Sequence, residues 1–224
     1  MSEEKKFIVK ILDIENVTHD VKRFKIEKPK GYEFTPGQAT EVSINKESWK
    51  NKKRAFTFTC LNNEKNLEFS IKIYQRGGVT EEIGRAKIGD ELEIGEPWGV
   101  IHYKNSGVFI AGGAGITPFI AIFRELNRKG KLKGNTLIFS NKTEKDIILK
   151  DEFDSYKDLR KIYTLTREEK KGFEKGRVDE KFLKSKIDNF KKYFYICGPT
   201  RMVGELQALV KKLGADVDSV IVES

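Results

Sequence analysis

The densest group of residues that could do chemistry lies in the segment GVFIAGGAGITPFIAIFREL. An apolar run leads into Gly112, Gly113 and Gly115, and Thr117 and Pro118 open the helical pattern that follows. Glycines at a strand end let the backbone turn tightly and approach a bound group closely. The helix start behind them suits a pyrophosphate, because it offers unpaired N–H groups and partial positive charge. We predict a nucleotide-binding turn, although the third glycine of GxGxxG is missing and a purely structural turn stays open.

Three further polar turns follow apolar runs later in the chain. They are Ser140-Asn141-Lys142, Thr166-Arg167 and Cys197-Gly198-Pro199. Ligands of open α/β sheets bind outside the carboxyl ends of the strands, so these turns would lie at the correct edge. Taken singly, each turn is as readily an ordinary loop, and Cys197 a small buried apolar residue.

The N-terminal half has its own candidate strand, RAFTFT. At the period of a strand, Arg54, Phe56 and Phe58 would face one way, with Thr57 and Thr59 opposite. That places a cation, aromatic rings and hydroxyl groups along one strand. A half-buried strand with a surface arginine is the plain alternative.

A second glycine turn into a helix is predicted at GGVTEE, which begins at Gly77. We expect Thr80 to cap the helix, because a threonine hydroxyl accepts a hydrogen bond from a first-turn N–H. The turn would form a second place for an anion. Two such places in one small chain suggest two phosphorylated ligands.

The elements that must position these residues follow two different patterns along the chain. Up to about residue 102, short β-runs alternate with turns, which predicts an antiparallel Greek-key β-barrel. After Tyr103, short apolar strands alternate with helical patterns, which predicts a five-stranded parallel α/β domain covered on both faces. The expected strands are 7–12, 21–26, 39–44, 54–61, 67–74 and one within GDELEIGEPWG, then 107–111, 136–140, 161–166, 193–197 and 219–222. The expected helices are 118–128, 145–156, 179–187 and 202–213. The predicted domains are 1–102 and 103–224.

Composition excludes several classes of protein. The chain has 224 residues, and its longest apolar stretch is interrupted by glycine, threonine and proline, so we expect no transmembrane helix. The N-terminus MSEEKKFIVK has no apolar signal-peptide core, so a cytoplasmic location is expected. We also expect a monomer. Two cysteines cannot supply a disulfide framework or a four-thiolate iron–sulfur site, and no metal site is predicted.

The net charge of +9 is unevenly spread. Up to Lys104 there are 19 basic and 17 acidic residues (+2), and beyond it 24 and 17 (+7). Acids interrupt the bases almost everywhere, unlike the basic faces of nucleic-acid binders, so no nucleic-acid partner is predicted. A solvated lysine-rich surface is the plain interpretation, and attraction to an acidic protein or a phosphorylated cofactor the other.

The order RAFTFT, GGVT, GDELEIGEPWG, GGAGITP and CGP resembles the ferredoxin–NADP⁺ reductase (flavodoxin reductase) family, over essentially the whole chain. The resemblance implies an FAD-binding barrel at 1–102 and a pyridine-nucleotide domain at 103–224, without the iron–sulfur domain of some relatives. Many relatives end in an aromatic residue that covers the flavin, whereas this sequence ends Val222-Glu223-Ser224.

By position, the resemblance also implies roles for single residues. Arg54 would pair with the flavin's phosphate, Phe56 lie against the isoalloxazine, and Thr57 hydrogen-bond near N5. Cys197 and the near-terminal acid Glu223 would join Thr57 as the catalytic group. The remaining implied cofactor contacts are Lys72, Ile73 and Tyr74 beside FAD, Gly78, Val79 and Thr80 at its pyrophosphate, Gly113, Thr117 and Pro118 in the nicotinamide-nucleotide loop, Asn141 and Arg167 near the ribose, and Gly198 and Pro199 beside the nicotinamide.

The implied activity is an FAD-dependent NAD(P)H oxidoreductase. Hydride would pass from nicotinamide C4 to flavin N5, and electrons onward, singly, to an acidic flavodoxin or ferredoxin. Reduction of free flavin or another small acceptor stays open, as does an electron-transfer or regulatory subunit of a larger complex. An RNA-binding module without flavin would be colourless, whereas a flavoprotein is yellow.

The choice between NADPH and NADH rests on the turns after the second and third parallel strands. A 2′-phosphate needs a cation near the ribose, and Arg167, with Lys142 or Arg177, favours NADPH. Asn141, however, stands where many NADPH-using relatives carry arginine. The expectation therefore leans to NADPH.

Overall fold

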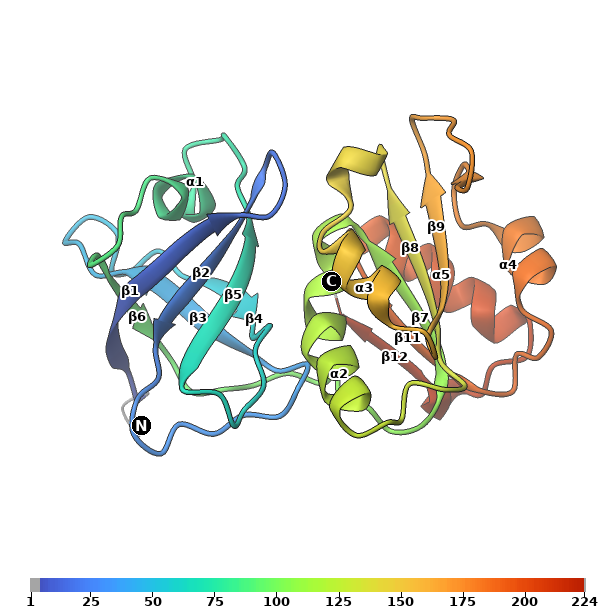
Figure 1. Cartoon of the computed structure of the whole chain (residues 1–224), viewed down its shortest axis with the longest axis horizontal. Coiled ribbons are helices and arrows are strands. Elements are labelled where there is room, and N and C mark those ends of the chain that lie inside the picture. The colour runs from blue at the N-terminus through green and yellow to red at the C-terminus, as the bar shows by residue number, and fades with distance from the viewer. Residues whose placement is uncertain (1–4, 224) are drawn as a thin grey trace.

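A computed structural model describes residues 5–223, so the first four residues and Ser224 lie outside the described part of the chain (Figure 1). The first sheet has six antiparallel strands in the order β4-β3-β6-β1-β2-β5, with an isolated bridge between Phe58 and Phe69 joining its ends. Its elements are β1 (Phe7–Asn16), β2 (Val21–Glu27), β3 (Ala39–Ile44), β4 (Arg54–Thr57), β5 (Asn66–Lys72), β6 (Glu91–Ile94) and the short helix α1 (Val79–Gly84). The predicted antiparallel barrel is confirmed, and it is called the barrel half below.

Strand β4 ends at Thr57, four residues earlier than the sequence predicts. The N–H of Phe58 donates to Gln38 O (3.0 Å), whereas the N–H of Thr59 donates to Glu68 O (2.9 Å). The chain thus changes partner from β3 to β5 as the barrel closes. Because of this change, Phe58 and Thr59 are both fully buried, and the predicted alternation of RAFTFT does not extend past β4.

The second sheet has six parallel strands in the order β10-β9-β8-β7-β11-β12. Its strands are β7 (Gly107–Gly112), β8 (Thr136–Asn141), β9 (Arg160–Leu165), β10 (Glu174–Lys175), β11 (Tyr193–Cys197) and β12 (Val220–Glu223). Each of the five predicted strands is present, but the sheet has six strands and not five. Strand β10 was missed because it has only two residues, within a highly charged segment that carries no apolar period.

Helices cover both faces of the parallel sheet, and with it they form the parallel half (Figure 1). They are α2 (Thr117–Arg128), α3 (Lys150–Ser155), α4 (Glu180–Lys186) and α5 (Thr200–Lys212). Helix α3 begins later than predicted, because Leu149 has a left-handed backbone (φ 52°) that separates it from a 3₁₀ turn at Glu144–Asp146. Among the described residues, no helix has the length and apolar character needed to cross a membrane.

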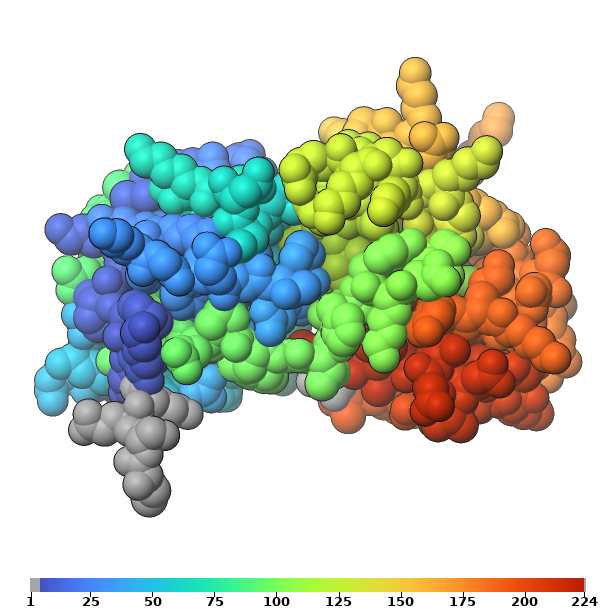
Figure 2. Space-filling view, turned by 90° about the horizontal axis from the view of Figure 1, so that it is seen from below, coloured from blue at the N-terminus to red at the C-terminus, as the bar shows by residue number. Residues whose placement is uncertain are grey.

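The two faces of the parallel sheet are covered by different helices. Phe119 and Phe123 of α2 and Phe153 of α3 belong to the core on the face turned toward the barrel half (Figure 1). Val21 of β2 is buried in that same core, so the two halves share apolar packing. Helices α4 and α5 pack on the far face, with residues such as Leu183. In Figure 2, seen from below, the chain between β6 and β7 (green) passes from one half to the other, and the domain boundary at 102 stays a prediction.

Candidate functional site

The glycine-rich segment leaves β7 at the carboxyl edge of the parallel sheet. Residues Gly113–Ile116 form one 3₁₀ turn, and α2 begins directly after it with Pro118 in its first turn. The Thr117 hydroxyl donates to Ala114 O (3.0 Å), and no side chain caps α2. Gly113 has φ 53° and no atom within 4 Å of its Cβ position, so its backbone is accessible. The predicted strand-to-helix turn is confirmed.

This loop packs directly on the Cys197-Gly198-Pro199 turn. A Cβ atom on Gly115 would lie 2.3 Å from the carbonyl oxygen of Cys197 and 2.5 Å from the N of Gly198. A Cβ on Gly112 would lie 2.5 Å from Met202 Sδ and 3.0 Å from Pro199 Cδ. The two motifs, 80 residues apart in sequence, therefore form one surface that has no room for side chains at these glycines.

Glu223 lies beside Cys197, because the two residues are register partners in β12 and β11. The Glu223 Oε2 atom is buried and has no hydrogen-bond partner among the described residues. Burial raises the pKa of Glu223 above its ordinary value. Burial and the nearby Glu223 carboxyl together raise the pKa of the Cys197 thiol to about 12. The thiol therefore stays protonated at neutral pH, and the carboxyl is biased toward its protonated form.

A series of neighbouring residues connects Cys197 and Glu223 to the barrel strand that carries Thr57. Thr57 is the register partner of Ala39 in β3, and Ala39 forms an isolated bridge with Trp98. The next residue, Gly99, has its Cβ position 3.7 Å from Glu223 Oε2. The structure thus brings the end of the parallel sheet against the barrel wall near Thr57.

The barrel residues assigned to FAD present a surface that fits it. Arg54 is exposed, with its guanidinium donating to the carbonyl of Lys53 (3.0 Å). Phe56 is half-buried, its ring 6.3 Å from that of Phe69. The Thr57 hydroxyl makes no hydrogen bond to another described residue, so it is free to bind a ligand in a largely buried position. A cation, an aromatic face and an unpaired hydroxyl form a donor set that suits a phosphorylated flavin.

The glycine turn before α1 is open. No atom lies within 4 Å of the Cβ positions of Gly77 and Gly78, and Gly77 has φ 69°. The prediction that Thr80 caps the helix is wrong, since Gly78 is the N-cap and the Thr80 hydroxyl accepts a hydrogen bond from the N–H of Tyr74 (3.3 Å). The extended backbone of Gly78 starts the helix two residues before Thr80, with Val79 as its first residue.

The other predicted FAD contacts lie along the end of β5. Lys72 pairs with Asp20 at 2.6 Å, Ile73 packs against the barrel core, and Tyr74 is 49% exposed. An exposed tyrosine and an open glycine turn on one rim leave room for the adenine end of a dinucleotide. The assigned contacts themselves stay predictions.

A cavity of about 250 Å³ lies at the carboxyl edge of the parallel sheet, where the far end of a nicotinamide dinucleotide would reach. Its lining residues are Ser140, Thr166, Arg177, Val178, Pro199, Arg201, Met202, Glu205 and Leu206. Arg201 Nε donates to Glu205 Oε1 at 2.7 Å. Arg167 is exposed and does not line the cavity, and Asn141 is buried with both amide atoms unpaired within the described part of the chain. The sequence named Arg177 only as a possible helper of Arg167, and it missed Arg201 and Glu205 as the other charged groups here.

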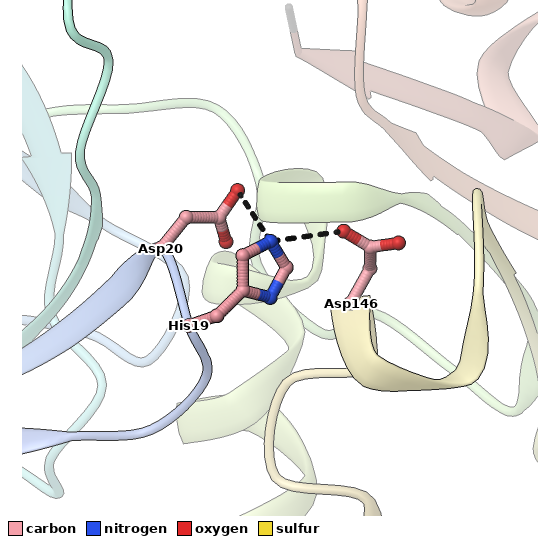
Figure 3. Close-up of side chains that lie close together, drawn as sticks. All are labelled: His19, Asp20 and Asp146. Atoms are coloured by element: carbon pink, nitrogen blue, oxygen red, sulfur yellow. Dashed lines mark ion pairs between the residues drawn. The ribbon is translucent and has the colours of Figure 1, made fainter.

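An ionic contact crosses between the halves near this edge, shown in Figure 3. His19, in the turn between β1 and β2, lies between Asp20 (3.6 Å) and Asp146 (3.9 Å). These ligand atoms lie within 4.8 Å of one another, a spacing that a metal ion could use. The pairing of Asp20 with Lys72 and the hydrogen bonds of Asp146 to Thr143 already satisfy both carboxylates. We therefore treat the group as an ionic contact.

Comparisons with known proteins agree with this arrangement. Residues 8–103 match the oxidoreductase FAD-binding domain, and residues 109–208 match the oxidoreductase NAD-binding domain. The chain is 32% identical to NADH-cytochrome b5 reductase 2 of Mycosarcoma maydis, over 93% of this chain and 69% of the relative. It is also 32% identical to NADH-cytochrome b5 reductase 2-A of Vanderwaltozyma polyspora, over 92% and 80%.

Solved structures show the same fold. A ferredoxin NADP⁺ reductase from Neisseria gonorrhoeae superposes with a TM-score of 0.87 at 20% identity, covering 99% of each chain. The cytochrome b5 reductase domain of Ulva prolifera nitrate reductase gives 0.85 at 20%, covering 98% of this chain and 97% of the other. The fold and site define a two-domain flavin- and nicotinamide-binding oxidoreductase. The chain belongs to the ferredoxin–NADP⁺ reductase-type family of FAD- and NAD-binding oxidoreductases.

Proposed function

We propose that this chain is a flavoprotein reductase that takes hydride from NADH and delivers electrons to a small haem protein of the cytochrome b5 class. The carrying observation is the meeting of Gly115, Cys197 and Glu223 at the sheet edge that adjoins the barrel strand with Thr57. When bound, FAD supplies the conversion of a two-electron hydride into single electrons. The b5-class acceptor is proposed from the names of the relatives.

The chain's own residues would orient the two rings and exclude water. Phe56 offers an aromatic face, and the Thr57 hydroxyl is free to donate to, or accept from, the flavin edge. The accessible Gly113 backbone and the uncapped start of α2 would bind the nucleotide's phosphates. Glu223 Oε2, in its buried position, can hold a proton beside the nicotinamide ring.

The structure also supports NADH in place of NADPH. Arg201, one of the two arginines at the cavity, is already paired with Glu205, and Arg177 also lowers the pKa of that carboxyl. A 2′-phosphate entering here would meet the Glu205 carboxylate, whereas a ribose hydroxyl could donate to it. The expectation of NADPH from the sequence is therefore not supported.

The nucleotide proposal is tested with Glu205→Gln and Arg177→Ala. We expect Glu205→Gln to raise kcat/KM for NADPH relative to NADH by about tenfold, since each ~1.4 kcal/mol is tenfold and a charge-assisted hydrogen bond is worth about 1.5–3 kcal/mol. Adding Arg177→Ala to Glu205→Gln should remove that gain in kcat/KM for NADPH. A wild-type preference for NADPH, or an unchanged ratio in Glu205→Gln, would contradict the proposal.

The acceptor is tested by comparing four electron acceptors at equal concentration. Purified yellow protein is mixed with NADH and then with a cytochrome b5 haem domain, a flavodoxin, a ferredoxin or free FMN. We expect the haem domain to react fastest, with a rate that falls as salt rises because the chain is cationic. Faster reduction of flavodoxin, ferredoxin or FMN would replace the proposed acceptor, and a colourless protein that takes up no FAD would overturn the flavoprotein itself.

A further inference from the structure

One buried arginine, Arg124 on α2, connects the two halves. Its side chain is only 17% exposed. Nη1 donates to Thr59 O and to Glu68 Oε1, both at 2.7 Å and both in the barrel half. Nε and Nη2 donate to the two oxygens of Glu152 on α3, at 2.7 and 2.8 Å. The guanidinium thus has one bidentate partner in its own half and two partners in the other.

The barrel partners are themselves held in place. Glu68 is 8% exposed, and its Oε1 also accepts a hydrogen bond from the Thr59 hydroxyl at 2.8 Å. Thr59 is hydrogen-bonded through its backbone N–H to Glu68 O. Arg124 therefore binds two segments that are hydrogen-bonded to each other, the one with Thr59 and the one with Glu68. Neither segment can move without breaking hydrogen bonds to the other.

The position of this contact relates the two sites to each other. Thr59 lies two residues beyond Thr57, about 7 Å along an extended chain. Arg124 lies seven residues beyond Thr117, which begins α2 at the glycine loop, about 10 Å along the helix axis. A single side chain thus connects the segment that carries Thr57 to the helix that carries the nicotinamide loop.

Contacts at the rim cannot set this geometry as firmly. The His19 side chain is 58% exposed and lies 3.9 Å from Asp146, so water and salt weaken the pair. The Arg124 hydrogen bonds are shorter, charge-assisted and largely removed from water. A fixed guanidinium fork also specifies direction, which a single ion pair at the surface does not.

We propose that Arg124 is a positioning residue that sets the distance and orientation between the flavin strand and the nicotinamide loop. It touches neither ring, and it acts through Thr59 and Glu68 on one side and through α2 on the other. Because misplacement by about 1 Å can cost about 100-fold in rate, loss of the contact lowers hydride transfer before it lowers binding. The inference rests on the proposed flavin and nicotinamide sites, but not on the identity of the acceptor.

The test uses a matched pair of isosteric variants. Glu68→Gln weakens the hydrogen-bonded contact between the halves. Glu152→Gln weakens the bidentate contact of Arg124 within the parallel half, and across the halves it removes only the attraction of Glu152 to Arg23. Arg124→Met removes both, and Arg124→Lys retains the charge without the fork. Hydride transfer is followed by stopped-flow bleaching of the flavin at saturating NADH, and nucleotide affinity by calorimetry with NAD⁺.

We expect Arg124→Met to slow hydride transfer by about 10- to 100-fold, with FAD content and nucleotide Kd within about threefold of wild type. Glu68→Gln should slow it by a smaller factor, Arg124→Lys should restore part of the rate, and Glu152→Gln should stay near wild type. If Arg124→Met does not fold, Glu68→Gln and Arg124→Lys still carry the comparison.

A second measurement needs neither FAD nor activity. Spin labels are placed at two exposed lysines, by Lys30→Cys in the barrel half and Lys171→Cys in the parallel half, while the native Cys60 and Cys197 are buried. Pulsed electron resonance then gives the distance distribution between the halves. It should broaden in Glu68→Gln and Arg124→Met but not in Glu152→Gln.

Two results would overturn the inference: a narrow distribution with wild-type hydride transfer in Glu68→Gln, or an equal loss in Glu152→Gln, which would indicate a general effect on stability. An apoprotein whose distances broaden as expected, but which binds no FAD, would instead contradict the proposed function and leave the interdomain contact standing.

Discussion

The two glycine turns look alike in sequence but differ in three dimensions. Nothing lies within 4 Å of a Cβ on Gly77 or Gly78, whereas a Cβ on Gly115 would meet the backbone of Cys197 at 2.3 Å. The barrel turn uses glycine for an unusual φ and for access. The turn of the parallel half uses glycine because two backbones touch.

Each turn also has an acid, and the acids differ in the same way. Glu81, at the open turn, accepts a hydrogen bond from the N–H of Gly77 (2.7 Å) and pairs with Arg85. The Oε2 atom of Glu223, at the packed turn, is buried and has no partner in the described part of the chain. The unpaired, buried Glu223 Oε2 atom therefore destabilises the packed turn, and a bound ligand could relieve this by hydrogen-bonding to it. At the open turn, the Glu81 carboxylate already has its partners.

The largest effect is expected from Gly115→Ala. The new methyl group cannot fit against the Cys197 carbonyl, so the loop or β11 must shift, at a cost of about 1–3 kcal/mol. We expect Tm to fall by about 2–4 °C for each kcal/mol and hydride transfer to fall by about 100-fold. Differential scanning fluorimetry and stopped-flow flavin reduction measure both.

Gly204→Ala in α5 is the matched control, since nothing lies within 4 Å of that Cβ position. Alanine in a helix interior is favoured over glycine by about 0.5–1 kcal/mol, so this variant should be as stable as wild type or more so. Equal behaviour of the two variants would show that the close contact at Gly115 is not what requires glycine there.

The next effect concerns the buried acid. Because the pKa of Glu223 is raised in the folded protein, the folded state binds the proton more tightly than the unfolded state. Below the ordinary carboxyl pKa range, Glu223 is protonated in both states and does not destabilise the fold. As pH rises through the pKa of Glu223 in the folded protein, the buried carboxylate lowers the free energy of unfolding. Glu223→Gln should raise Tm by about 2–4 °C at pH 8, the shift for about 1 kcal/mol, and leave it unchanged near pH 4. Glu81→Gln is the comparison at the open turn, and an equal pH-dependent gain there would contradict this account.

The last pair of substitutions separates two uses of glycine within the open turn. Gly77→Ala places a side chain at φ 69° and should cost about 1–2 kcal/mol, whereas Gly78→Ala, at φ −101°, should leave the apoprotein's stability unchanged. Gly78→Ala should instead weaken FAD binding several-fold, because its methyl group occupies the open space over the turn. Thermal unfolding of the apoprotein and an FAD titration distinguish the two. A Gly78→Ala protein that is destabilised but binds FAD normally would reverse these roles.

Much of the architecture follows from local patterns. The alternation of Leu67, Phe69 and Ile71 and the apolar runs before GGAG and CGP predicted the strands and the barrel-then-α/β order that the structure confirms. The end of β4 could not be predicted, because it depends on Phe58 changing partner as the barrel closes. Strand β10 could not either, since its two residues owe their strand geometry to pairing with β9.

The site shows the same division. The motif order placed Thr57, Cys197 and the glycine loop correctly on their elements, but it gave Arg167 the main role and Arg177 only a supporting one, whereas Arg177 is the one that lines the cavity. Residue type and strand position were known, whereas the direction of each side chain depends on the paths of the loops after β8 and β9. The only local hint of Arg124 is a cation within an otherwise apolar helix face, which is compatible with a surface residue just as well.

The amino-acid sequence by itself determined the elements, their order and the chemistry offered at the strand ends, because apolar periods and glycine turns act over a few residues. The tertiary structure alone decided which glycines are packed and which are open, and that Arg124 joins the two halves. It also decided that the Glu223 Oε2 atom is buried with no partner among the residues that the structure describes. These depend on segments distant in the sequence meeting in space, as Arg124 meets Thr59 and Glu68, which lie 65 and 56 residues away from it. Such meetings are fixed by the closure of the barrel and the docking of α2, for which no local pattern exists.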